Sequence, residues 1–285
     1  MPKIRYPFTP ERLDAYPEPL AELSRGLEIK LLQEIVSRLK AAGQLNEVTV
    51  QDIRALRSHG IDLKEIKKAI QEWANISEKE LNKLLDDVVK RNQKYYTAVI
   101  DLAKVTKPAY LVDQRDIAAI RRQTWAAYRN ITQSMGFLVV QGGRLTLLPP
   151  AEAYMAALDS AELQVMSGAI SYNEAIANAI RELADKGLCV AYDKDGNLLK
   201  NRVQYESKHP GKIGHISHLD VAVRRAVMTG VNQINQKYRE ESMDYLETDL
   251  VEVTAHLGAR NIQRQGEPDF VAHTNWQGKV FRWKK

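Results

Sequence analysis

Apolar residues recur every three to four positions through most of the stretch from Leu20 to Val105. The first run ends at Gly43, and its apolar positions are Leu20, Leu23, Leu27, Leu31, Ile35 and Leu39. This spacing places the apolar side chains on one face of an α-helix. The pattern predicts a short helix from Thr49 to Gly60 and another beginning near Asp62. The capping sequence Ser77–Glu80 predicts the start of a helix of about 28 residues.

After Pro108, short segments with the spacing of a helix are followed by short segments typical of strands. Asp113–Gly136 has helical spacing, and the β-rich run Phe137–Leu148 is interrupted by Gly142 and Gly143, which favour a tight hairpin turn. Pro149 and Pro150 then open a predicted helix that runs to about Met166.

The capping sequence Ser171–Glu174 predicts a helix that ends at Gly187. A second hairpin is predicted from Leu188–Tyr192 and Leu198–Tyr205, on either side of the turn Asp193–Gly196.

The last third predicts one long helix followed by a strand. Asp220–Tyr245 carries two stripes at helical spacing, one apolar and one that mixes apolar with arginine and asparagine residues. In Asp249–Arg260, apolar and polar residues alternate as they do in a strand. We therefore predict an α+β fold, mostly helical in its N-terminal half, with short antiparallel hairpins and one long helix in its C-terminal half. The predicted domains are an extended, proline-rich N-terminal arm (1–19), a helical domain (20–136) and an α+β C-terminal domain (137–285).

Composition narrows the class of protein without identifying it. The chain has 285 residues, 44% of them hydrophobic and 27% charged, which are ordinary values for a globular protein. The single cysteine, Cys189, lies in an apolar run and predicts a buried core residue, because no disulfide can form within the chain. The N-terminus lacks the apolar core of a secretory signal, so we expect synthesis in the cytoplasm.

The candidate functional residues concentrate between Ser217 and Phe281. Five of the six histidines lie in this last third, and Arg224, Arg225 and Asn232 fall on the long helix. An arginine and asparagine stripe can hold a neighbouring strand or loop, or can be a solvated face. We interpret these residues as parts of one structural or interaction cluster, with no catalytic residue, metal or cofactor; its members are Arg224, Arg225, Asn232, His256, Arg260, His273, Trp276 and Gln277.

Three ordered blocks of this region resemble the phage minor capsid protein 2 family. They are Leu219–Gln233, Asp249–Arg260 and His273–Phe281, and Ser167–Ile176 is similar to the family more weakly. The closing Gly-Lys-Val-Phe block is also similar to the end of the Mu-type head morphogenesis domain.

The resemblance implies a structural virion protein of a tailed phage or prophage, with no enzyme activity. It would lie at the portal vertex or inner head and act in head assembly or in DNA packaging or ejection. The implied partners are the portal protein, the major capsid protein or both, in a ring-related assembly of several copies, without a membrane.

Two other functions remain open from the residues themselves. The net charge of +5 allows sequence-independent contact with packaged DNA, although no cluster of basic and amide residues marks a recognition helix. A metal-dependent enzyme centred on His256 and His273 is the other alternative, because zinc is commonly bound by converging histidines and carboxylates.

Overall fold

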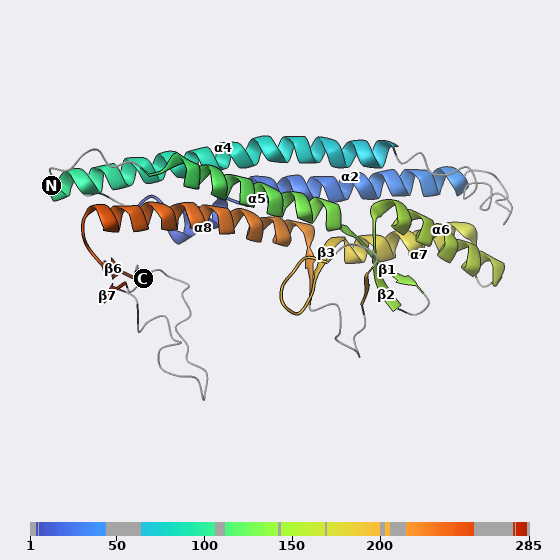
Figure 1. The fold of residues 1–285 in the computed structure, drawn as a ribbon. Coiled ribbons are helices and arrows are strands. Elements are labelled where there is room, and N and C mark those ends of the chain that lie inside the picture. The colour runs from blue at the N-terminus through green and yellow to red at the C-terminus, as the bar shows by residue number, and fades with distance from the viewer. Residues whose placement is uncertain are drawn as a thin grey trace, which may run out of the picture. The chain divides into compact units, whose positions relative to one another are not determined.

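The computed structural model describes residues 4, 6–43, 64–105, 112–141, 144–168, 170–199, 203–205, 215–253, 276 and 278–283. They form an α+β fold, as predicted (Figure 1). The chain divides into two compact units. The first comprises residues 1–15, 85–120 and 230–285, and the second comprises residues 16–84 and 121–229.

The helices of the second unit follow the apolar periodicity of the sequence. Helix α2 (Glu18–Gly43) buries the face predicted for it, and Leu20, Leu31 and Ile35 have no exposed surface. The second unit also contains residues 64–84 of helix α4 (Lys64–Ala103) and residues 121–134 of helix α5 (Gln114–Ser134).

The predicted helix start at Ser77 is wrong. Helix α4 is continuous through this position, and Ser77 is fully buried within it. Trp73 before Ser77 and Leu81 after it are both buried, so the apolar stripe passes through the serine without interruption. Burial of one continuous stripe outweighs a capping sequence, because most helix stability in proteins comes from packing of the apolar face.

A five-stranded antiparallel sheet lies in the second unit, in the order β4-β2-β1-β3-β5. Its strands are β1 (Gly136–Gln141), β2 (Arg144–Leu148), β3 (Leu188–Tyr192), β4 (Val203–Tyr205) and β5 (His215–His218). The predicted hairpin of β1 and β2 is confirmed, and its register pairs Phe137 with Leu148. Leu138, Leu147, Cys189 and Ala191 form an apolar cluster across these strands.

The second predicted hairpin is largely wrong. The Asp193–Gly196 turn is present, but in the described residues the pairing after it is limited to the Tyr192–Leu198 bridge and a hydrogen bond from the Leu199 amide to the Ala191 carbonyl at 2.8 Å. Strand β3 pairs instead with β1 and β5, and β4 pairs with β2. Residues 188–191 of β3 are buried, and the strand lies inside the sheet with β1 on one side and β5 on the other.

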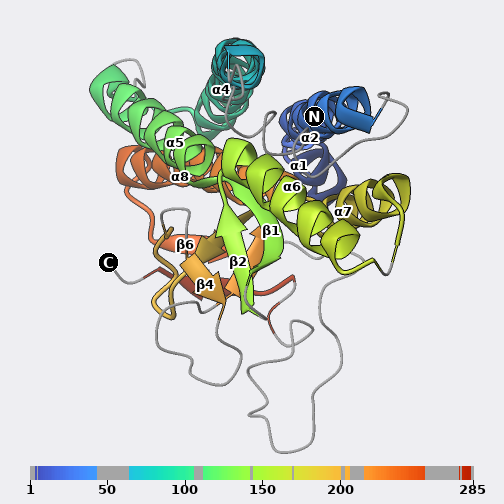
Figure 2. The same ribbon diagram turned by 90° about the vertical axis from the view of Figure 1, so that its right-hand side faces the viewer.

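Two helices cover strand β1, as Figure 2 shows. Helix α6 (Pro150–Met166) begins at a proline, and helix α7 (Tyr172–Lys186) is capped by Ser171, whose hydroxyl accepts a hydrogen bond from the Glu174 amide at 3.3 Å. Both helices were predicted with these starts. The Glu182 carboxylate accepts a bond from the Val140 amide at 2.9 Å and so joins α7 to β1.

The first unit is organised around aromatic side chains. It contains helix α1 (Pro10–Ala15), strands β6 (Leu250–Glu252) and β7 (Val280–Arg282), and residues 230–245 of helix α8 (Leu219–Tyr245). Tyr6 contacts Tyr95 edge to face, and Tyr96 stacks on the fully buried Tyr238. The start of the chain therefore contributes to the core of this unit.

Candidate functional site

The beginning of helix α8 carries a network of ion pairs within the second unit. Arg224 pairs with Glu18 of α2, and Arg25 of α2 pairs with Glu18 at 2.5 Å and with Asp220 at 3.2 Å. The four side chains are 25–43% exposed. Ion pairs with this exposure contribute little stability but fix orientation when several are linked. Arg224, one of the sequence-predicted residues, thus joins α8 to α2.

Arg225 contacts the other neighbour of α8, strand β5. Its guanidinium donates to the Ser217 hydroxyl at 3.3 Å and lies 3.2 Å from Nε2 of His215, whose ring stacks on Tyr192 at a centroid distance of 4.7 Å. A guanidinium can only donate hydrogen bonds, so Nε2 of His215 is the acceptor in this contact. The Nε2 lone pair of His215 is therefore engaged by Arg225.

Cys189 is a core residue, as predicted, and has no features of a nucleophile. Its side chain is buried, its thiol donates to the Lys186 carbonyl at 3.3 Å, and its sulfur lies 3.9 Å from Nδ1 of His218. Burial, together with the nearby Glu28 and Asp220 carboxylates, raises the pKa of this thiol to about 12. The thiolate is therefore negligible at neutral pH.

Glu28 ties helix α2 to the start of β3. Its carboxylate accepts a hydrogen bond from the Leu188 amide, and burial raises its pKa more than this bond lowers it. A Cβ on Gly187, which has a φ of +64°, would lie 2.8 Å from Oε1 of Glu28. The positive φ therefore favours glycine at this position, and the Glu28 carboxylate packs against it.

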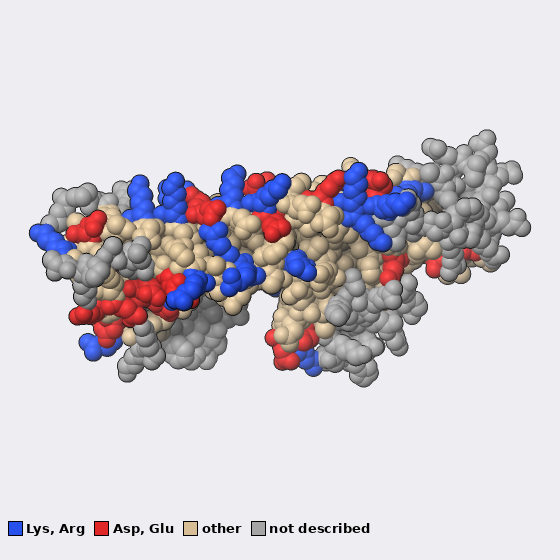
Figure 3. All heavy atoms as spheres, turned by 45° about the horizontal axis from the view of Figure 1, so that its top comes forward, with Lys and Arg blue, Asp and Glu red and all other residues tan. Residues whose placement is uncertain are grey.

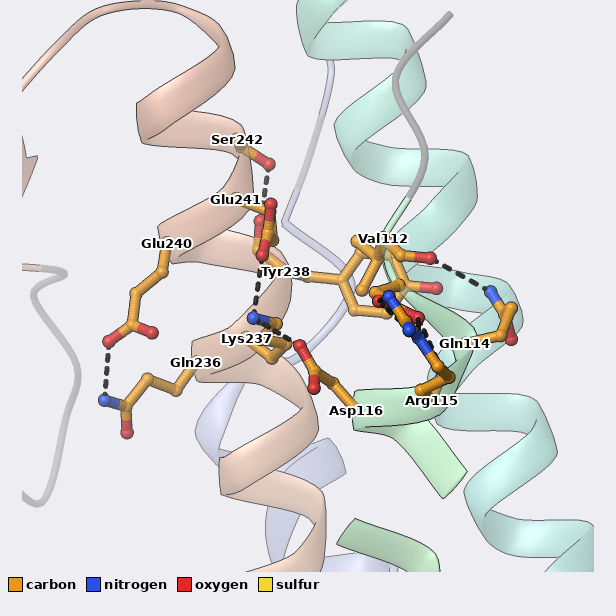
Figure 4. Close-up of polar contacts among 11 residues, drawn as sticks. Val112, Gln114, Arg115, Asp116, Gln236, Lys237, Tyr238, Glu240, Glu241 and Ser242 are labelled. Carbon is orange, nitrogen blue, oxygen red and sulfur yellow. Dashed lines mark hydrogen bonds and ion pairs between the residues drawn. The ribbon is translucent and has the colours of Figure 1, made fainter. Parts of the chain in front are cut away.

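The later part of α8 carries a second polar contact, which lies in the first unit. Asn235 is buried and accepts a hydrogen bond from the Asn92 side chain at 2.7 Å. Lys237 pairs with Asp116 of α5 at 2.6 Å and with Glu241 at 2.7 Å, and these contacts raise its pKa (Figure 4). Asn232, which the sequence favoured, is exposed instead. Asn235 lies four residues after the buried Val231, so it falls on the same helix face. This spacing was the sequence signal that could have identified Asn235 as buried.

The remaining predicted residues are described only in part. Trp276 contacts Phe281 at a centroid distance of 5.0 Å, whereas His256, Arg260, His273 and Gln277 lie outside the described residues. The convergence of the whole cluster therefore stays a prediction.

Two further features bear on the class of protein. Within the described ranges, no group of three histidine, cysteine or carboxylate side chains is placed to hold a metal ion. No helix in that same part of the chain has the length and apolarity needed to cross a bilayer.

Comparison with known protein families identifies a match. The sequence model of the family described as phage minor capsid protein 2 matches residues 8–204 and 208–284, nearly the whole chain. No curated protein and no solved structure matches the chain significantly. The match includes the long helices, the five-stranded sheet and the ion-paired start of α8. The chain therefore belongs to the phage minor capsid protein 2 family and is a structural protein of the phage virion.

Proposed function

We propose that this protein is a minor component of a tailed-phage head, bound at the portal vertex or the inner head surface. There it acts in head assembly or in DNA packaging or ejection, through contacts with the portal protein, the major capsid protein or both. The observation that carries this proposal is the family match over residues 8–204 and 208–284.

The geometry of the described residues supports binding more than catalysis. Nε2 of His215 is occupied by Arg225, and burial keeps the Cys189 thiol protonated. The ionic contacts of Arg224 and Arg25 join elements of the fold. These polar side chains are thus engaged in holding the structure, which fits a protein that presents surfaces to partners.

The distribution of charge favours protein partners over DNA. On the face of the described residues that Figure 3 shows, basic and acidic side chains are interspersed. Several basic residues there and elsewhere are paired with carboxylates, such as Arg91 with Asp87 at 2.5 Å and Lys30 with Glu72 at 2.8 Å. Binding to the phosphate backbone depends on basic residues that displace counterions, and mixed charge weakens it.

The test uses purified heads and purified protein together. Mass spectrometry of heads from the phage that encodes this chain should detect it at a low, fixed ratio to the major capsid protein. Size-exclusion chromatography with light scattering should show co-elution with the portal or capsid protein at a defined stoichiometry. Absence from heads would refute the proposal. Tight DNA binding that weakens steeply with salt, without binding to either protein, would favour the DNA alternative.

A further inference from the structure

A groove of about 490 Å³ runs between helix α2 and the first part of helix α4, entirely within the second unit. One wall is formed by Pro19–Lys30 and the other by Ala69–Glu80. Each wall spans about three helical turns, roughly 17 Å at 1.5 Å per residue. The two helices run side by side here, as Figure 1 shows, and the Lys30–Glu72 ion pair spans them. The groove therefore has the length and walls of a site for a third helix of about three turns.

The floor of the groove is apolar and partly exposed. Leu23, Leu27, Ala69, Trp73 and Ile76 line it. Leu27, Ala69 and Trp73 are buried, Leu23 is half-buried, and Ile76 is 48% exposed. An apolar residue with this exposure is ordinary when isolated, but here it adjoins a concave apolar surface. The surface offers anchors for the apolar face of a partner helix.

Gly26 keeps the floor of the groove open. It lies in the interior of α2, where glycine costs about 0.5–1 kcal/mol relative to alanine. A Cβ at this position would have no heavy atom within 4 Å. Packing inside this chain therefore gives no reason for a glycine at this position, whereas any side chain here would fill part of the groove.

The rim of the groove carries more negative than positive charge. Glu22, Glu72 and Glu80 line it together with the cation Lys30, which is bound to Glu72 at 2.8 Å, and Lys83, outside the lining, lies 3.7 Å from Glu80. The lining thus has three carboxylates and one ammonium group. A partner helix with lysine or arginine beside its apolar face would complement this rim.

We infer that this groove binds an amphipathic helix with basic flanking residues, supplied by another protein of the same phage head. This inference rests on the proposed function and names the surface through which it operates. The apolar anchors of the helix lie over Leu23 and Ile76, and its basic residues face Glu22 and Glu80.

The test uses the full-length protein and fluorescein-labelled 20-residue peptides that tile the portal and major capsid proteins of the same phage. Fluorescence anisotropy should identify at least one peptide that binds and that has a basic, amphipathic helical pattern. Gly26→Leu should weaken its binding at least about tenfold, because the new side chain occupies the groove. The unfolding midpoint of this variant should equal or exceed that of the wild type, since leucine is a better helix former than glycine.

Two matched pairs of variants locate the contact. Ile76→Glu should weaken binding at least about tenfold, whereas Ile29→Glu should not, because Ile29 is 56% exposed on α2 but does not line the groove. Glu80→Lys should weaken binding several-fold and reduce its dependence on salt. Glu78→Lys is its control, since Glu78 is exposed two residues earlier on the same helix and lies outside the groove.

Each outcome bears on one proposal. Equal peptide binding by the wild type and Gly26→Leu, or no binding by any tiled peptide, would overturn the groove inference. If light scattering reveals a dimer that Gly26→Leu disrupts, the occupant is a second copy of this chain, and the inferred partner is wrong. Wild-type protein present in purified heads would leave the proposed function standing in all these cases, whereas absence from heads would remove it.

Discussion

The same substitution, glycine to alanine, should have opposite effects on stability at two positions of the second unit. At Gly136, the first residue of β1, a Cβ would lie 2.2 Å from the Leu148 carbonyl oxygen and 2.8 Å from the carbonyl carbon. Both are backbone atoms of the neighbouring strand β2, so no side-chain rotation relieves the clash. At Gly26, a Cβ meets open space.

The magnitude at Gly136 follows from the movement that the clash requires. Strands β1 and β2 must separate by about an ångström at Leu148, next to the Phe137–Leu148 pair and opposite the Gly136–Cys189 pair. Overpacking of this kind costs about 1–3 kcal/mol, and a weakened ladder hydrogen bond costs about 1 kcal/mol more. We expect Gly136→Ala to lower the free energy of unfolding by about 3 kcal/mol, and Gly26→Ala to raise it by about 0.5–1 kcal/mol.

Thermal unfolding followed by circular dichroism measures both effects. For a unit of this size, 1 kcal/mol corresponds to about 2–4 °C, so Gly136→Ala should lower the midpoint by roughly 6–12 °C. Gly26→Ala should raise it by a few degrees. The reasoning would be refuted if Gly136→Ala matched the wild type, or if Gly26→Ala were the less stable of the two variants.

Three further predictions concern buried polar groups. Asn235→Ala should destabilise the first unit by about 1–3 kcal/mol in urea unfolding, because Asn92 loses the acceptor of its 2.7 Å hydrogen bond; the double variant with Asn92→Leu should recover part of the loss, and a purely additive result would contradict this. The free energy of unfolding of Glu28→Gln, relative to that of the wild type, should increase as pH rises from 4 to 7. Burial raises the pKa of the Glu28 carboxyl above its ordinary 4.5, so its contribution is present below pH 4.5 and is lost as pH rises through the raised value; equal urea midpoints for the two proteins at pH 4 and pH 7 would argue against burial. Cys189 should react with iodoacetamide only on unfolding, since its buried thiol has a pKa of about 12; rapid labelling of the folded protein, read by mass spectrometry, would show that the thiol is accessible.

Local signals in the sequence predicted most elements of the fold. The proline start of α6, the Ser171 cap of α7 and the β1–β2 hairpin each depend on a few adjacent residues, and each is confirmed. The same kind of signal failed at Ser77, where the apolar stripe of α4 continues through a capping sequence. Short-range patterns are reliable where no tertiary contact competes with them.

The pairing of β3 and the position of the groove could not be read from the sequence. Strand β3 pairs with His215–His218, more than twenty residues away, and no local pattern selects this partner over the adjacent Leu198–Tyr205. The groove combines residues of α2 and α4 that are about fifty positions apart. Of the predicted cluster, Arg224 and Arg225 lie on α8 as expected, but their partners Glu18 and His215 carried no motif.

The glycine in the middle of α2 has a consequence for how this protein responds to selection. Mutation and selection for thermal stability alone would favour alanine or a larger helix former at Gly26, since no neighbour opposes it. Each such gain would make the groove shallower. If the groove binds its partner as inferred, stability and partner recognition conflict at this one position, and a library of Gly26 variants sorted separately for heat resistance and for head incorporation should diverge there.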